Sequence, residues 1–129
     1  ILIFGSEADK KVASQVCQNA RVPLVDLTGM TTLAQAMALI SRCRLFVTND
    51  SGLMHIAAAL RIPLIAIFGS TEPDRTAPLG ENCRLVRKPL PCSPCLKTDC
   101  PEKMRCMDLI SVDEVFGEVL RVLPERVGK

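Results

Sequence analysis

The sequence has no tryptophan and no tyrosine, and four phenylalanines supply all of its large aromatic rings. Proteins that bind single-stranded nucleic acid stack the bases on such rings, so this composition offers little surface for them. The formal charge of +2 also lacks the basic excess that is typical of nucleic-acid-binding domains. Both shortages exclude nucleic acid as a partner.

Long apolar runs are missing as well, because none approaches the ~20 residues that a membrane-spanning helix needs. The sequence shows no secretory leader and no initiator methionine. It opens instead with Ile1–Gly5, an apolar run that predicts a buried strand. We interpret residues 1–129 as one cytoplasmic domain, cut from a longer protein whose N-terminal part is absent.

Cysteine, in contrast, is abundant, with seven residues in 129. An odd number of cysteines without a leader disfavours a secreted disulfide framework. Residues 87–106 are rich in proline, cysteine and basic residues, which predicts one long loop. This Cys-rich loop holds Cys92, Cys95, Cys100 and Cys106.

Short apolar runs alternate with segments of helical spacing along the whole chain. We expect strands at 1–4, 24–27, 44–48, 63–68 and 83–86, and helices at 9–19, 31–41, 52–60 and 111–123. This alternation predicts a doubly wound, Rossmann-like α/β domain with about five or six parallel strands and crossover helices. Ligands of such sheets bind at the carboxyl ends of the strands, here at residues 5–9, 28–31 and 49–51.

Several side chains have expected places in this fold. The helix at 52–60 is apolar nearly all round and should be deeply buried, and Thr31 or Thr32 should cap the helix before it. Ser111 and Glu114 have the spacing of a capping box at the last helix. Apolar helix faces are expected from Val12, Ala13, Val16, Cys17, Leu33, Ala36, Met37 and Ile40, and core or pocket packing from Met30, Met37 and Met54.

Residues 48–55, Thr-Asn-Asp-Ser-Gly-Leu-Met-His, join an expected strand to an expected helix through a small polar turn. The first turn of a helix carries free N–H groups and a partial positive charge. Ser51 and Gly52 would let a phosphate approach those groups. Asp50 would contact a sugar hydroxyl and His55 a phosphate oxygen. In the structural alternative, Asp50 or Ser51 merely caps the helix and His55 is a satisfied core residue.

The run from Val47 to Leu60, followed by Pro63–Gly69, resembles the ADP-heptose:lipopolysaccharide heptosyltransferases of glycosyltransferase family 9, most closely their heptosyltransferase II branch. The Asp-Ser-Gly-Leu-x-His element is the most specific part. Weaker matches are Phe4–Ser6 with Asp9, Thr28-Gly29 with Thr31–Leu33, and Ser70–Asp74. Together these matches cover nearly the whole chain.

The resemblance implies the C-terminal half of a two-domain GT-B glycosyltransferase, which binds the donor ADP-heptose for heptose transfer to the lipopolysaccharide inner core. It implies inverting transfer with a carboxylate general base in the absent N-terminal acceptor domain. No catalytic residue is therefore expected in this chain, which should be inactive alone. Helix N–H groups would stabilise the leaving diphosphate, so we expect no catalytic metal and no cofactor.

Residue roles also follow from the resemblance, by position. Ser51, Gly52 and Leu53 would present backbone N–H groups to the diphosphate, with His55 beside it. Asp50 would contact the heptose.

At the other end of the donor, Asp9 would bind the ribose and Thr31 would pack against adenine. For Asp9 the alternative is an N-cap of the first helix. Contacts that read the base are not evident in the sequence, so a UDP-sugar or another nucleotide sugar stays open as the donor.

The Cys-rich loop has the spacing Cys92-x2-Cys95-x4-Cys100-x5-Cys106. Four thiols suit a tetrahedral Zn²⁺ site by number, but the second pair lacks the usual spacing. A structural zinc, one or two disulfides, and free or packed thiols all remain open. A zinc-stapled, non-enzymatic nucleotide-binding module is the rival to the enzyme.

Residues 84–105 also carry a basic excess, with six lysines and arginines against Asp99 and Glu102. Such a segment would attract phosphorylated lipopolysaccharide or an anionic surface, placing the protein peripherally at the inner membrane. The alternative is a solvated basic loop. The six residues are Arg84, Arg87, Lys88, Lys97, Lys103 and Arg105.

Overall fold

The computed structural model describes residues 1–97 and 99–123. The chain divides into two compact units, Ile1–Leu39 and Ile40–Lys129, which are described one at a time. Both consist of parallel strands and connecting helices, so the expected α/β class is confirmed. No helix in the described ranges is long and apolar enough to cross a membrane.

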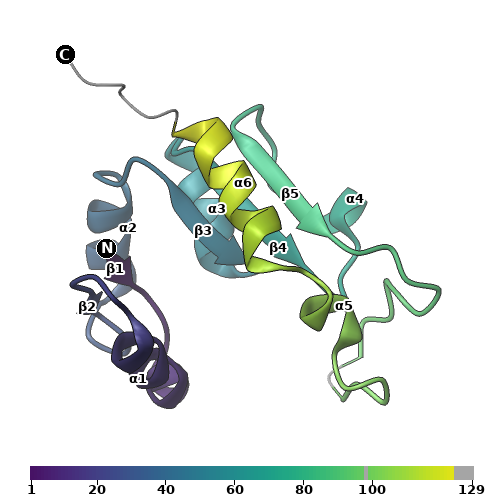
Figure 1. Cartoon of the computed structure of the whole chain (residues 1–129). Coiled ribbons are helices and arrows are strands. Elements are labelled where there is room, and N and C mark those ends of the chain that lie inside the picture. The colour runs from purple at the N-terminus through teal and green to yellow at the C-terminus, as the bar shows by residue number, and fades with distance from the viewer. Residues whose placement is uncertain (98, 124–129) are drawn as a thin grey trace. The chain divides into compact units, whose positions relative to one another are not determined.

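The first unit is a parallel βαβ crossover (Figure 1). Its elements are β1 (Leu2–Ile3), the 3₁₀ helix η1 (Glu7–Asp9), α1 (Lys10–Asn19), β2 (Val25–Asp26) and α2 (Leu33–Ile40), whose last residue falls in the second unit. The Val25 N–H donates to the Ile1 carbonyl and the Leu27 N–H to the Ile3 carbonyl, both at 2.9 Å. The parallel pairing therefore extends beyond the two short strands.

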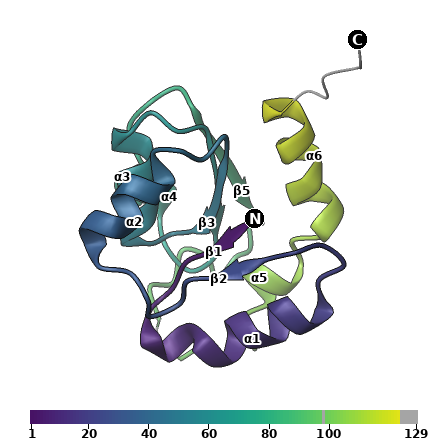
Figure 2. The ribbon, with the colours of Figure 1, turned by 90° about the vertical axis from the view of Figure 1, so that its left-hand side faces the viewer.

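The second unit is a three-stranded parallel sheet in the order β3-β4-β5. Its elements are β3 (Phe46–Asn49), α3 (Gly52–Ala59), β4 (Leu64–Phe68), α4 (Pro73–Thr76), β5 (Cys83–Arg87), α5 (Arg105–Asp108) and α6 (Val112–Val122). Figures 1 and 2 show α3 on one face of this sheet and α6 on the other. The sheet is thus enclosed between two helices.

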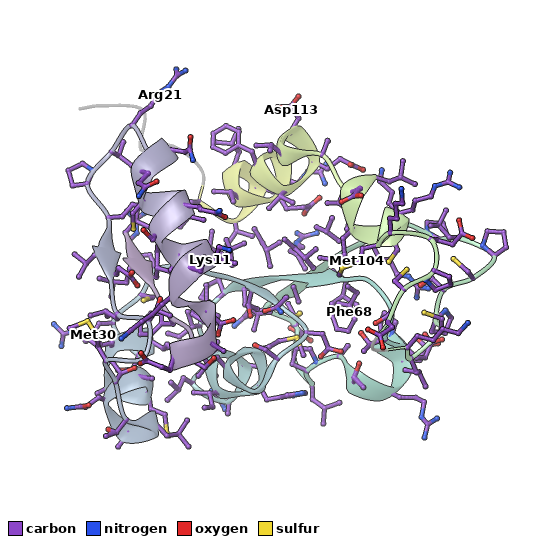
Figure 3. The ribbon with its side chains drawn as sticks, turned by 90° about the horizontal axis from the view of Figure 1, so that it is seen from below. Lys11, Arg21, Met30, Phe68, Met104 and Asp113 are labelled. Atoms are coloured by element: carbon purple, nitrogen blue, oxygen red, sulfur yellow. The ribbon has the colours of Figure 1, made fainter. Side chains whose placement is uncertain are left out.

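The central strand β4 forms the core of the second unit. Its residues Leu64, Ile65, Ala66 and Phe68 are at most 1% exposed. In Figure 3, Phe68 lies among packed side chains, whereas Asp113 of α6 extends outward. A continuous apolar strand of this kind is typical of parallel sheets covered on both faces.

Complete burial of α3 was the wrong expectation. Met54 and Ala57 are fully buried, but His55 and Ala59 are exposed. Because α3 lies on one face of a single sheet, only the side that meets β3 and β4 is covered. The apolar character of its outer side comes largely from alanine, a small side chain that tolerates water.

The predicted apolar faces of α1 and α2 are only partly covered. Ala13, Ala36 and Ile40 are buried as expected. The side chains expected inside but found exposed are Val12, Val16, Met30, Leu33 and Met37. Helical spacing identifies the side of a helix that is apolar, but a sheet of two short strands is too small to cover all of it.

The capping box expected at the start of the last helix is confirmed. The Ser111 hydroxyl accepts from the Glu114 N–H at 3.2 Å, and the Glu114 carboxylate accepts from the Ser111 N–H at 2.9 Å. The described residues hold five strands, in sheets of two and three. The four-residue helices α4 and α5 were not predicted, because one turn is too short to show a period.

Candidate functional site

The turn between β3 and α3 leaves the start of the helix open. Ser51 is the N-cap residue and has extended backbone angles, φ −150° and ψ 167°. Among the described residues its side chain makes no capping hydrogen bond. Its hydroxyl lies 3.3 Å from the Thr48 hydroxyl, at the end of β3. The N–H groups of the first helical turn therefore keep their capacity to bind an anion.

Gly52 adds free space to this helix start. A Cβ placed on Gly52 would meet no atom of residues 1–97 and 99–123 within 4 Å. Gly52 is exposed, and the next residue, Leu53, is half-buried. A ligand can therefore approach the backbone at Gly52 without displacing a side chain.

Asp50 is held by a residue that the sequence analysis missed. The Thr76 hydroxyl, on α4, lies 3.1 Å from Asp50 Oδ2 and 3.0 Å from the Glu72 carbonyl oxygen. Arg87 of β5 pairs with the Glu72 carboxylate at 3.6 Å. Of the two residues in the capping alternative, Ser51 holds the N-cap position, so Asp50 is not the cap. Its carboxylate is oriented by α4 instead. Thr76 is the last residue of a short helix that was not predicted, and a single threonine forms no sequence pattern that would reveal this contact.

His55 lies one turn inside α3 and is exposed. Its interpretation as a core histidine is therefore wrong. The helical register turns Met54 inward and leaves His55 on the uncovered side.

In the first unit, Asp9 closes the loop after β1. Its Oδ2 accepts hydrogen bonds from the Ser6 hydroxyl at 2.6 Å and from the Ser6 N–H at 2.7 Å. The hydroxyl bond and then the N–H bond lower the pKa of Asp9 below its ordinary value. Asp9 occupies the N-cap position of α1, but among the described residues its side chain does not cap that helix. The carboxylate is thus ionised, exposed and held in place at neutral pH.

Two glycines allow this loop to pack against the turn after β2. A Cβ on Gly5 would lie 3.0 Å from Asp9 Cβ and 3.1 Å from Thr28 Cγ2. Gly29 has φ +68°, donates to the Gly5 carbonyl at 2.9 Å, and has no room for a side chain beside Glu7. The positive φ and the close approach therefore require glycine at position 29, whereas a side chain at position 5 would need its neighbours to move by a few tenths of an ångström.

The cap of α2 belongs to Thr32. Its hydroxyl accepts from the Gln35 N–H at 3.3 Å, and the Gln35 side chain accepts from the Thr32 N–H at 2.9 Å. Thr31 is half-buried and lies just before this capping box. Asp9 and Thr31 belong to the first unit, and residues 50–55 belong to the second.

Most of the Cys-rich loop is a long connection between β5 and α5, but its first residue, Arg87, ends the strand and its last two, Arg105 and Cys106, begin the helix. Thr98 lies outside the described residues. The Ser93 hydroxyl donates to the Gly69 carbonyl at 2.7 Å. The N–H groups of Cys95 and Leu96 both donate to the Ser70 carbonyl, at 3.0 and 2.9 Å. The loop is thus tied to the carboxyl end of β4.

All four loop cysteines line one pocket of about 200 Å³, together with Asn49 and Asp50. Every cysteine is a free thiol. Within the described residues, no three cysteine, histidine or acidic side chains are grouped closely enough to hold a metal ion. The structure therefore joins the Cys-rich loop to the strand ends that hold Asp50.

Comparison with known proteins agrees with the motif at the start of α3. The family profile described as glycosyltransferase family 9 (heptosyltransferase) matches residues 1–105, well over half of the chain. The chain belongs to glycosyltransferase family 9. Lipooligosaccharide heptosyltransferase 2 of Haemophilus influenzae is 44% identical over 91 residues, covering 67% of this chain and 26% of the relative. The Campylobacter jejuni protein of the same name is 34% identical over 128 residues, covering 95% of this chain and 40% of the relative.

Solved structures agree with the family 9 fold. The Escherichia coli ADP-heptose lps heptosyltransferase II matches with a TM-score of 0.79 and 32% identity, covering 95% of this chain and 35% of that one. The Veillonella parvula family 9 glycosyl transferase matches with a TM-score of 0.83 and 23% identity, covering 95% of this chain and 36% of that one. This family 9 chain thus spans about a quarter to two fifths of the length of these relatives.

In this family 9 chain, three of the six basic residues counted around the Cys-rich loop are paired with glutamates. Arg84 pairs with Glu118 at 3.9 Å, Arg87 pairs with Glu72 at 3.6 Å, and Lys88 pairs with Glu114. These pairs neutralise half of the charge that would attract an anionic surface. The solvated-loop interpretation gains support for the other three, Lys97, Lys103 and Arg105, all exposed.

Proposed function

We propose that this chain is the C-terminal, donor-binding half of a GT-B glycosyltransferase that transfers heptose from ADP-heptose to the lipopolysaccharide inner core. One observation carries the proposal: in the described part of the chain, α3 begins without a side-chain cap, at a glycine open to approach, next to an oriented carboxylate. Family 9 membership and the names of the relatives support the choice of sugar and acceptor.

The helix start binds the diphosphate in this proposal. The N–H groups of Ser51, Gly52 and Leu53 donate to phosphate oxygens, and the exposed His55 lies beside them. Asp50, held by Thr76, accepts a hydrogen bond from a hydroxyl of the sugar. The Asp50 side chain is suited to this task because its carboxyl oxygens accept hydrogen bonds from hydroxyl groups.

The nucleoside binds at the residues of the first unit. Asp9 uses Oδ2 for both hydrogen bonds from Ser6, which leaves Oδ1 for a ribose hydroxyl. Thr31 packs against adenine, just before the first turn of α2.

Transfer requires little chemistry from this half. An acceptor oxygen attacks the anomeric carbon, its proton passes to a general base in the N-terminal domain, and the bond to the diphosphate breaks. Negative charge then grows on the departing ADP, where the N–H groups of the α3 start stabilise it. Because these dipoles replace a cation, the reaction needs no metal. EDTA should leave the rate unchanged; a large loss that Mg²⁺ restores would contradict this step.

The reaction takes place in the cytoplasm, with peripheral contact to the inner membrane where the lipopolysaccharide acceptor is anchored. The paired basic residues limit how much of that contact the Cys-rich loop can supply.

An NMR titration followed at backbone amides tests the donor site. The complete polypeptide that contains this chain is titrated with ADP and, separately, with UDP. We expect shifts with ADP at Asp9, Thr31 and Ser51–Leu53. Shifts with UDP alone would replace the donor with a UDP-sugar. Shifts with neither, at millimolar ligand, would mean that these residues do not form a nucleotide site and would end the proposal.

A further inference from the structure

The Cys-rich loop is built closely onto the carboxyl end of β4. The loop is anchored there through Ser93 and Cys95, as described above. A Cβ on Gly69 would lie 2.7 Å from Met107 Sδ and 3.4 Å from Cys106 Sγ. The end of the loop, with α5, therefore contacts the strand so closely that only glycine fits at position 69 without a shift. This packing gives the loop a defined position over the strand ends.

The pocket at the loop is lined by groups of different chemistry from different segments. Asn49, Asp50 and Thr71 supply polar groups from the strand ends. The loop and α5 supply sulfur through Cys92, Cys95, Cys100, Cys106, Met104 and Met107, and charge through Lys97, Glu102 and Arg105. A sugar ring, which carries both hydroxyl and C–H groups, would match this mixed lining.

The size of the pocket limits its occupant. Its volume is about 200 Å³, whereas pockets for drug-sized ligands have about 300–1,000 Å³. A whole nucleotide sugar is too large for this space, but a single sugar ring is not. The sugar is also the part of a nucleotide-sugar donor that directly follows the diphosphate, and Asp50 connects the pocket to the start of α3.

We propose that the Cys-rich loop is the selective wall of the donor-sugar subsite, with the Cys92 thiol at its accessible edge. This inference rests on the proposed function, because it assumes a donor whose diphosphate binds at α3. The sugar hydroxyls meet Asn49 and Asp50, and the carbon skeleton packs against thiols and Met104. The loop thereby limits the size and shape of the sugar, while the nucleotide is bound elsewhere.

Chemical modification of Cys92 tests the inference without a substitution that could disturb the fold. It is exposed, whereas the other cysteines of the described residues are half-buried or buried. Accessible thiols react first with alkylating reagents. With iodoacetamide, the Cys92 sulfur displaces iodide, forms a carbon–sulfur bond and releases a proton. The added carbamidomethyl group then narrows the subsite.

The experiment measures alkylation of the complete polypeptide by peptide mass spectrometry, with ADP-heptose or ADP present. At ten times its dissociation constant, a ligand leaves about one-tenth of the sites free, so ADP-heptose should slow Cys92 alkylation about tenfold. ADP at equal saturation should leave the rate nearly unchanged. Cys83 is the internal control, because it begins β5 at the opposite end of the sheet from the pocket.

A second measurement uses calorimetry on the alkylated protein. ADP should bind as before, and ADP-heptose should bind more weakly, whereas a Cys92→Ser variant, which has no thiol to alkylate at this position, should have the same two affinities before and after treatment. If ADP protects Cys92 as well as ADP-heptose does, the thiol lies at the nucleotide and the inference is wrong. If both ligands bind and neither protects, the loop is remote from the sugar and the inference is equally wrong. If neither binds, the proposed function has failed, and this inference fails with it.

Discussion

Replacing Gly52 with alanine separates anion binding from helix stability. The new Cβ meets no atom within 4 Å, so the free protein has room for it. The same holds for Gly117, in the middle of α6, where a Cβ also meets nothing within 4 Å. Gly117→Ala is therefore a matched control, a glycine-to-alanine change in a helix distant in sequence from the candidate site.

The two variants should differ in ligand binding and not in folding. Alanine replaces glycine in a helix interior with a gain of about 0.5–1 kcal/mol, so Gly117→Ala should raise the free energy of unfolding by this amount. Gly52→Ala should leave that free energy unchanged or slightly raised. Its methyl group, however, occupies the space through which a phosphate reaches the backbone. Loss of one hydrogen bond to a charged group costs about 1.5–3 kcal/mol, which weakens ADP binding roughly 10–150-fold.

For each variant, the affinity for ADP is measured by calorimetric titration, and the free energy of unfolding is measured in urea. Gly52→Ala should lose affinity without losing stability, and Gly117→Ala should keep its affinity. Wild-type affinity in Gly52→Ala would refute the assignment of the diphosphate to the start of α3. A joint loss of affinity and stability would show instead that the substitution disturbs the fold, contrary to the open space around Gly52.

Three further perturbations test other parts of the structure. Thr76→Val removes the hydroxyl that contacts Asp50 and should weaken ADP-heptose binding about tenfold, a typical value for one such bond; Thr76→Ser should restore it, and equal affinities in calorimetry would contradict the role of α4. Met54→Ala empties a fully buried site and should cost about 2–5 kcal/mol in urea unfolding; a smaller loss would show that α3 is packed more loosely. Lys88 and Ser111 lower the pKa of Glu114 to about 2, so its stabilising contribution is complete above its ordinary value of 4.5 and is lost as the pH falls through about 2. Glu114→Gln should therefore unfold more easily than the wild type at pH 6, with the difference shrinking towards pH 2, and a difference independent of pH would oppose this assignment.

Local sequence patterns predicted the helices and strands well, but they predicted poorly which side chains of these elements are exposed. The apolar run of β4 and the Ser111–Glu114 capping box were both predicted correctly, because burial on two faces and a three-residue hydrogen-bonding pattern are visible in consecutive residues. The exposure of His55 and Val12 was not predicted, because it depends on how much sheet lies against each helix. Helical periodicity shows which side of a helix is apolar, but it does not show how much sheet surface is available to cover that side.

The sequence by itself determined the order of the strands and of the longer helices, the open turn at Asp50–Gly52 and the resemblance to family 9. Each of these depends on residues that are neighbours in the chain. Only the tertiary structure decided that Thr76 contacts Asp50 from 26 positions away, and that Ser93 ties the Cys-rich loop to Gly69 across 24. It also decided that glutamates pair with Arg84, Arg87 and Lys88. The contacts of Asp50 and Gly69 form because folding brings the carboxyl ends of parallel strands to one edge, where segments with no common local pattern meet. The pairs of Arg84 and Lys88 with α6 form because this helix packs against β5.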